Sequence, residues 1–204
     1  MTSTVTSPSG RVLQMRATVQ TTPQEDSAAK IVRIQPDLDE ERKKRLAENR
    51  ENLKNANVQA FLKAIAFAEG GAYDFKFGAI KGKKNDPWRF TDFSTHPGAG
   101  LNGKTAAGMY QITQETWRDH GGAAMGLTDF TPETQDLIAA NMLRRAGVIE
   151  KIKAGEIATS MLPAAKKWAA LPEGPGKGNH YPPQPYISYE SFIGKYKELG
   201  GTVK

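Results

Sequence analysis

The sequence predicts an α+β domain of mainly helical content that follows a polar N-terminal arm. Three observations predict it: an apolar helical stripe starting near residue 57, a stretch of alternating aromatic and polar residues after it, and further helix patterns up to the C-terminus. The chain has 204 residues, which is enough for one domain and an appendage. We therefore place the arm at residues 1–56 and the compact domain at residues 57–204.

The arm has two parts. Residues 1–36 are rich in Ser, Thr, Gln and Pro, which is typical of an extended or disordered segment. Residues 37–55 are predicted to form a charged helix, because Asp37 can cap it and Glu40 stands four residues before Lys44. Short apolar patches in the arm suit it to docking on a partner; they are Val12, Leu13, Met15, Ile31, Val32 and Ile34.

The compact domain opens with a helix that ends at Glu69, before two glycines. Alternation in residues 73–77 predicts a short strand and hence a small antiparallel sheet. A capping hydroxyl followed by proline, Thr131-Pro132, predicts the start of a helix that ends at Gly147. The other expected elements are a Gly-rich loop at 98–108 and helices at 110–120, 148–154, 157–171 and 189–199.

Composition excludes several classes of function. No apolar run approaches the roughly 20 residues of a membrane span, and the polar N-terminus lacks the apolar core of a secretory signal. Cysteine is absent and the three histidines are scattered, so we expect no metal site and no cofactor. The net charge of +6 fits either a well-solvated surface or attraction to a polyanion. Basic residues do not cluster beside aromatic ones, so we expect no nucleic-acid partner and favour the anionic bacterial envelope.

Glu69 is the leading candidate for a catalytic residue. Val58, Phe61, Leu62 and Ile65 form the buried stripe of one helix, and the next position of that stripe is Glu69. A carboxylic acid that is partly desolvated at a helix C-terminus resists ionisation. An acid that stays protonated near neutral pH is what the cleavage of a glycosidic bond requires. The alternative is a helix-terminal glutamate that simply reaches solvent.

No second carboxylate stands out as a partner for Glu69. Most glycosidases place two carboxylates around the scissile bond. Asp74, Asp86 and Asp92 lie in the presumed sheet, and Asp92 precedes Ser, Thr and Pro residues typical of a turn. The pattern therefore favours a mechanism with one enzyme carboxylate, in which the substrate supplies the nucleophile.

Two other segments are candidate substrate-binding sites. In the first, a loop of small residues leads through Gly108 to Tyr110 and Gln111, which offer a stacking face and hydrogen-bonding groups. Taken alone, this segment also fits an ordinary junction between loop and helix. In the second, Tyr181 and Gln184 lie in a loop rich in Pro and Gly, where they are plausible lip residues over a groove.

Together these segments resemble the lysozyme-like lytic transglycosylases and, more closely, the phage lambda endolysin family. The resemblance spans residues 57–204 and leaves out residues 1–56. The matching segments are 61–70, 90–97, 105–111, 126–136, 168–172 and 200–203. Two features depart from the family pattern: Met109 stands where an arginine is usual, and the loop at 173–184 is longer and richer in proline.

The resemblance implies a peptidoglycan lytic transglycosylase with a lysozyme-like fold. Such enzymes cleave the bond between N-acetylmuramic acid and N-acetylglucosamine without water. One glutamate donates a proton and then acts as base on the muramic 6-hydroxyl, which closes a 1,6-anhydro ring. Carried over by position, Glu69 is this acid and base, Tyr110 and Gln111 line the groove, and the loops at 101–104 and 173–184 form its lips.

Three biological roles follow as alternatives. We favour an enzyme carried in the phage virion, with residues 1–56 docking on other virion or tail proteins, that opens the wall during entry. The second is an endolysin that stays in the host cytoplasm until lysis. The third is a structural virion protein that keeps the fold for assembly. A hydrolysing lysozyme would need a second carboxylate, for which Asp92 is the only fair candidate.

Overall fold

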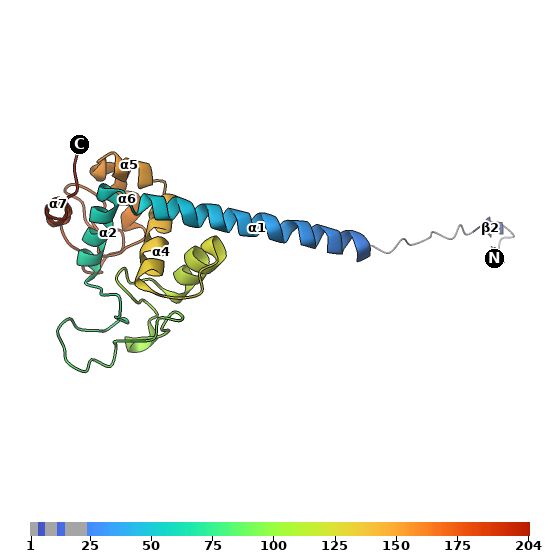
Figure 1. The fold of residues 1–204 in the computed structure, drawn as a ribbon, viewed down its shortest axis with the longest axis horizontal. Coiled ribbons are helices and arrows are strands. Elements are labelled where there is room, and N and C mark those ends of the chain that lie inside the picture. Colours follow the sequence, from blue (N-terminus) through green and yellow to red (C-terminus); the bar gives the residue numbers. More distant parts are fainter. Residues whose placement is uncertain (1–3, 7–11, 15–23) are drawn as a thin grey trace. The chain divides into compact units, whose positions relative to one another are not determined.

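The computed structural model describes residues 4–6, 12–14 and 24–204, with side chains described from residue 37 onward (Figure 1). It divides the chain into two compact units, Met1–Leu38 and Asp39–Lys204. In the first unit, strand β1 (Thr4–Thr6) pairs antiparallel with strand β2 (Val12–Gln14). The extended or disordered arm predicted for residues 1–36 is thus replaced by strands and helix where it is described, and its remainder lies outside the described residues.

Helix α1 (Gln24–Asn52) begins earlier than the predicted start at Asp37. The prediction placed the start there because Asp37 can cap a helix, but the helix already runs through Pro36 and Asp37, so Asp37 lies inside it. The part of α1 after residue 38 belongs to the second unit: Asn49 is fully buried and Leu46 packs on the core. The second unit therefore starts before residue 57, the predicted start of the compact domain.

Helix α2 (Ala56–Glu69) lies at the centre of the second unit. The Asn55 side chain caps it by accepting hydrogen bonds from the next turn's backbone N–H groups. The predicted stripe is buried, and Phe61 meets the ring of Phe192 edge to face at 5.1 Å. Phe192 belongs to α7 (Tyr189–Glu198), so the first and last helices of this core hold each other.

The predicted helix start at Thr131-Pro132 is confirmed. Helix α4 spans Pro132–Arg145, and the Thr131 hydroxyl accepts a hydrogen bond from the N–H of Thr134. Two short helices follow, α5 (Ile149–Lys153) and α6 (Ile157–Ala165). Helix α6 ends before the predicted residue 171, since the chain turns at Lys166 and Lys167. Helices α2, α4, α5, α6 and α7 surround one apolar core (Figure 1).

The small sheet predicted after α2 is not confirmed. In residues 70–131 the antiparallel pairing is limited to single bridges, such as Phe75 with Arg89 and Lys76 with Ala107. The alternation of residues 73–77 did not extend into a strand because turns follow it at once. Asp86 fixes one of them by accepting hydrogen bonds from the N–H groups of Ile80 and Trp88. A 3₁₀ turn, η1 (Leu101–Gly103), lies in the Gly-rich loop.

The helix predicted from Tyr110 starts later. Ala107 and Ile112 exchange backbone hydrogen bonds across a turn in which Gln111 has a φ of 48°. Thr113 then caps the short helix α3 (Gln114–Thr116), which continues as the π-helix η2 (Trp117–Ala123). Tyr110 and Gln111 therefore lie in a tight turn, where their backbone is fixed by hydrogen bonds rather than by a helix.

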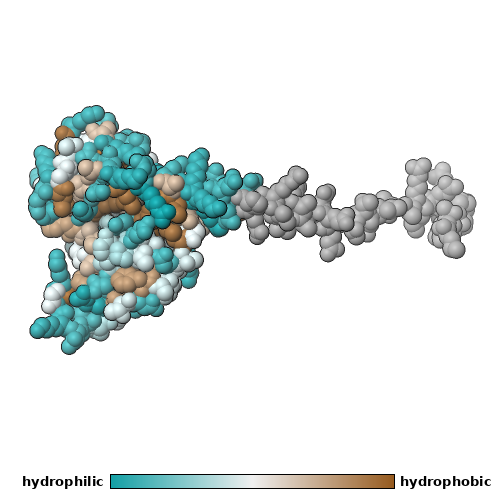
Figure 2. Space-filling view, in the orientation of Figure 1, coloured by the Kyte–Doolittle hydropathy of each residue, from teal (hydrophilic) through white to brown (hydrophobic). Residues whose placement is uncertain are grey.

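The visible surface of the second unit is mostly hydrophilic, with smaller apolar areas (Figure 2). Its exposed large apolar side chains include Phe67 and Ile80, which are 51% and 58% exposed. Within the described part of the chain, no helix combines the length and apolarity needed to cross a membrane.

The two phenylalanines of α2 give a test of this core. Phe61 is fully buried and Phe67 is 51% exposed on the same helix. Phe61→Ala should lower the free energy of unfolding by about 3–5 kcal/mol, because it leaves a cavity, whereas Phe67→Ala should cost less than about 1 kcal/mol. Urea denaturation followed by circular dichroism measures both. Equal losses would contradict the placement of α2.

Candidate active site

Glu69 is the last residue of α2, and the chain turns away directly after it. Gly70 ends the helix in the left-handed conformation with a φ of 66°. Gly71 lies against the next segment of the site: a Cβ atom there would stand 2.4 Å from the carbonyl oxygen of Met109. Only glycine leaves room for this approach, so Gly71 allows the end of α2 to lie directly against the turn at residues 108–111.

Burial raises the pKa of the Glu69 carboxyl to about 7. The Ala170 N–H, which donates a hydrogen bond to Oε1 at 3.3 Å, opposes this shift but does not cancel it. Among the described residues, no lysine, arginine or histidine forms an ion pair with Glu69. The side chain is therefore poised between acid and carboxylate near neutral pH, as a residue that both gives and takes a proton requires.

Glu69 faces a cavity of about 590 Å³. Its walls come from three segments: residues 103–106 with Phe77, the turn and helix start at Gln111 and Thr113, and residues 167–169 with Gln184. These segments contribute two lysines and a tryptophan to the wall, Lys104, Lys167 and Trp168. Glu69 is the only carboxylate among the residues that line this cavity.

The turn at residues 108–111 is fixed from behind by a buried glutamine. Gln135 on α4 is fully buried, and its Oε1 accepts the N–H of Met109 at 2.8 Å. Its Nε2 donates to the backbone oxygens of Tyr73 and Phe130. Because every hydrogen bond ends on backbone, this side chain fixes the path of the loop rather than any substrate.

Tyr110 lies behind the cavity rather than in it. It is 3% exposed, and its hydroxyl donates to Asp136 at 2.6 Å. The Tyr73 hydroxyl donates to the same carboxylate at 2.9 Å, and Trp168 Nε1 donates to the Tyr110 carbonyl at 3.1 Å. Burial raises the pKa of Asp136, while these two phenol hydrogen bonds oppose the shift. This position suits a residue that supports the site, not one that stacks on a sugar as predicted.

The other predicted binding residues divide between the wall and the rim. Gln111 and Gln184 both line the cavity. Gln111 donates from Nε2 to the Gly108 carbonyl, so Gly108 takes part through its backbone. Tyr181 does not line the cavity; it is 42% exposed and its hydroxyl donates to the carbonyl of Lys166. Of the two predicted lips, the loop at 101–104 contributes Gly103 and Lys104 to the wall.

A model of the family described as "Endolysin" matches residues 59–203. The chain belongs to the endolysin family. The endolysin of Escherichia phage lambda is 33% identical over 162 residues, which cover 74% of this chain and 95% of that protein. The endolysin of Escherichia phage P2 is 32% identical over 166 residues, covering 72% and 94%.

Solved structures show the fold of this family member. Bacteriophage lambda lysozyme complexed with a chitohexasaccharide is 32% identical, with a TM-score of 0.62 over 74% of this chain and 97% of that one. A second structure of the lysozyme from bacteriophage lambda is 30% identical, with a TM-score of 0.58 and the same coverage. The predicted lysozyme-like fold and family are therefore confirmed. The virion-associated role finds no support here, and the endolysin alternative fits the relatives better.

The carboxylates considered as partners for Glu69 are engaged in hydrogen bonds and an ion pair with nearby residues. Asp92 is exposed, and hydrogen bonds from the Ser94 side chain and then from its backbone N–H, at 2.8 Å, lower its pKa and mark a turn. Asp74 pairs with Arg89, and Asp86 holds a loop. In the part of the chain that the structure describes, no group of His, Asp and Glu side chains is arranged to hold a metal ion.

Sequence reasoning placed Gln184 at the groove and singled out residues 168–172 as a matching segment, but it did not place that segment or Lys167 on the cavity wall. Lys167 and Ala169 line the cavity, and Ala170 supplies the hydrogen bond to Glu69. These residues follow α6, about a hundred positions from Glu69, and nothing in their local pattern predicts this position. Trp168 is buried and lines the cavity as well.

The raised pKa of Glu69 predicts a dependence of stability on pH. The folded pKa of about 7 lies above the ordinary value of 4.5, so ionisation opposes folding and stability falls as the pH rises between these values. Glu69→Gln removes this penalty and should raise the free energy of unfolding by about 2 kcal/mol at pH 8, with little gain at pH 4. Urea denaturation of both proteins at the two pH values tests it. A gain that is independent of pH would show that Glu69 is solvated.

Proposed function

We propose that this member of the endolysin family is a peptidoglycan lytic transglycosylase in which Glu69 is the only proton donor and acceptor. The observation that carries the proposal is a single, partly buried carboxyl with a pKa of about 7 in a cavity whose lining contains no second carboxylate. A hydrolysing enzyme of the two-carboxylate type would need a second acid to activate water or attack the sugar. The absence of one from the lining favours attack by a group of the substrate.

The reaction then needs only Glu69 and the glycan. Protonated Glu69 donates its proton to the oxygen between the muramic and glucosamine units as the bond from C1 to that oxygen breaks. The resulting carboxylate accepts the proton of the muramic 6-hydroxyl while O6 bonds to C1. One C–O bond is broken and one C–O bond is formed. The leaving oxygen gains one proton and O6 loses one, so no water is consumed and Glu69 ends in its starting protonation state.

The walls of the cavity supply binding for a neutral glycan. Gln111 and Gln184 offer amide donors and acceptors to sugar hydroxyl and acetamido groups, and Thr113 adds a hydroxyl. The rim loop that carries Tyr181 borders the same opening through Gln184, whose backbone oxygen accepts a hydrogen bond from Asn179. The lambda lysozyme structure that this chain resembles holds a chitohexasaccharide, a neutral oligosaccharide, which supports a glycan as ligand.

The proposed biological role is degradation of the host wall at lysis. Both curated relatives are endolysins, and they match the part of the chain that contains Glu69. The proposal places the enzyme in the host cell before lysis and gives it no virion partner. The family match starts at residue 59, so the function of the arm before it stays a separate prediction.

The products of cleavage test the reaction. Purified peptidoglycan digested with the protein should give fragments ending in 1,6-anhydromuramic acid, identified by mass spectrometry. Reducing ends, which are heavier by one water, would mean hydrolysis and overturn the transglycosylase proposal. Glu69→Gln should lower the rate by about 10²–10⁴-fold, because it removes the proton donor but keeps the shape of the side chain.

The rate should also follow the ionisation of Glu69. Since the acid form is needed first, kcat/KM should fall as the pH rises through about 7. The rate of release of soluble fragments between pH 5 and 9 measures this limb. The residual activity of Glu69→Gln should not show it, and a limb that persists in the variant would assign it to another group.

A further inference from the structure

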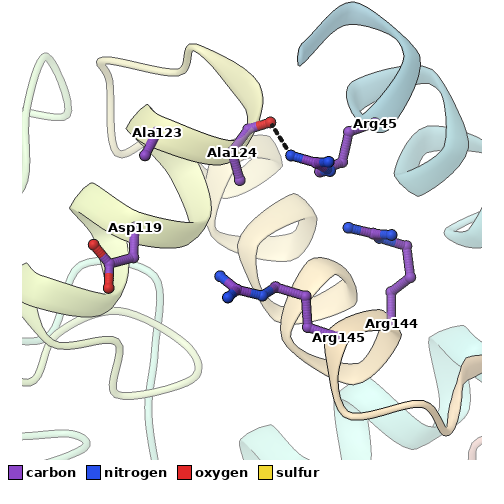
Figure 3. Close-up of a pocket in the computed structure, with 6 residues that line it drawn as sticks. All are labelled: Arg45, Asp119, Ala123, Ala124, Arg144 and Arg145. Atoms are coloured by element: carbon purple, nitrogen blue, oxygen red, sulfur yellow. Dashed lines mark hydrogen bonds between the residues drawn. The ribbon is translucent and has the colours of Figure 1, made fainter. Parts of the chain in front are cut away.

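A second pocket of about 320 Å³ lies on the second unit, between α1, η2 and α4. Three arginines line it, Arg45 from α1 and Arg144 and Arg145 from the last turn of α4, and their guanidinium groups extend into the shared space (Figure 3). We call these three residues the arginine pocket. Asp119 is the only acidic residue in its lining, so positive charge is in excess there.

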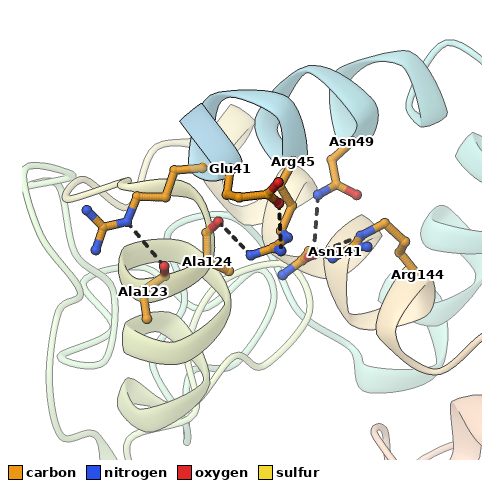
Figure 4. Close-up of polar contacts among 8 residues, drawn as sticks. Glu41, Arg45, Asn49, Ala123, Ala124, Asn141 and Arg144 are labelled. Carbon is orange, nitrogen blue, oxygen red and sulfur yellow. Dashed lines mark hydrogen bonds and ion pairs between the residues drawn. The ribbon is translucent and has the colours of Figure 1, made fainter. Parts of the chain in front are cut away.

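The arginine pocket is organised largely by neutral groups. Arg45 donates to the Ala124 carbonyl at 3.3 Å, and its nearest carboxylate, on the exposed Glu41, is 3.8 Å away (Figure 4). Arg144 donates through Nε and Nη2 to Asn141 Oδ1, at 3.2 and 3.1 Å. A guanidinium held by an amide oxygen keeps its full charge and its other donors for a ligand.

Arg145 is the most available of the three. It is exposed, and its side chain forms no hydrogen bond or ion pair with residues 37–204, whose side chains the structure describes. A pocket that gathers like charges without matching carboxylates pays for their repulsion unless an anion joins them. The chemistry of the site is therefore that of a receptor for a carboxylate or phosphate.

Arg145 of the arginine pocket and Lys167 of the catalytic cavity both act on one buried side chain, His120 of η2. Burial lowers the pKa of His120 to about 4, and the charges of Arg145 and Lys167 add to this. Lys167 lines the cavity that contains Glu69. A polymer bound in the cavity would therefore lie close to the positive charge of Lys167.

We propose that the arginine pocket binds a carboxylate of the peptide stems of peptidoglycan, while the glycan of the same polymer occupies the cavity. The proposal rests on the function proposed above. While its lactyl groups are amide-linked to the stems, the glycan backbone is neutral and guanidinium groups cannot select it, whereas the stems carry free carboxylates. An extended stem of about four residues reaches roughly 13 Å from its sugar, so it can contact protein outside the glycan groove. A concave pocket suits one anionic group better than a flat lipid surface does.

Paired substrates test this inference. Soluble glycan strands with intact stems are compared with the same strands after an amidase has removed the stems. The amidase leaves one lactyl carboxylate on each muramic sugar, directly beside the glycan and without the reach of a stem. Arg145→Gln should raise KM about two- to fivefold on strands with stems and leave KM on bare strands and kcat on both unchanged. Arg50→Gln is the matched control: it removes one positive charge from an exposed ion pair outside the arginine pocket and should change neither KM.

Each other outcome has a definite meaning. Equal KM values for wild type and Arg145→Gln on stem-bearing strands would overturn the inference, as would an equal rise on bare strands. Retained KM together with weaker sedimentation of Arg145→Gln on phosphatidylglycerol vesicles would overturn it in favour of a membrane. If the wild type cleaves neither strand, the proposed function fails instead. Arg145→Lys should recover part of the loss, since it restores charge without the bidentate fork.

Discussion

The desolvation of one carboxyl at the end of a helix is the constraint on which this structure depends. Glu69 cannot be moved into solvent without losing the raised pKa, and it cannot be buried deeper without losing the cavity. Three segments far apart in the sequence enclose it: the end of α2, the turn at 108–111, and residues 167–170 after α6. The close approach of Gly71 to Met109 and the hydrogen bond from Ala170 join the first segment to the other two. The fold therefore serves mainly to hold three backbone segments around one side chain.

The groups behind the cavity keep these segments in place. Asp136 and Gln135 stand next to each other on α4, and each reaches the turn at 108–111. Asp136 also accepts the hydroxyl of Tyr73, and Gln135 donates to the Tyr73 carbonyl, so the chain after α2 is held by the same pair. Such a network resists the small displacements that would expose Glu69 to water. The network lies behind the cavity wall. Tyr110 therefore supports the site through its hydrogen bonds with Asp136 and Trp168.

The sequence predicted the parts of this structure that depend on local chemistry. Helix α4 begins at the position that Thr131-Pro132 predicts, because a hydroxyl cap and a proline at the first helical position act within one turn. Glu69 was recognisable because the apolar spacing of α2 gave its phase. The predicted sheet was wrong because turns follow residues 73–77 at once and leave only single bridges. The predicted helix at Tyr110 was wrong because a tight turn, closed by the bridge from Ala107 to Ile112, takes the place of a helical turn. The positions of Lys167 on the cavity wall and of Ala170 beside Glu69 were not predicted, since only the folded chain brings these distant residues to Glu69.

The distribution of charge around the cavity follows from the chemistry proposed for Glu69. A lysine close to the carboxyl would lower its pKa and remove the proton needed for catalysis. Lys104 and Lys167 line the same cavity, yet the pKa of Glu69 is set by burial and by one backbone N–H. The Lys104 ammonium instead lies 4.6 Å from the centre of the Phe77 ring. The positive charge in the cavity lining thus leaves the pKa of Glu69 unaffected, so the carboxyl keeps the proton that the proposed reaction needs first.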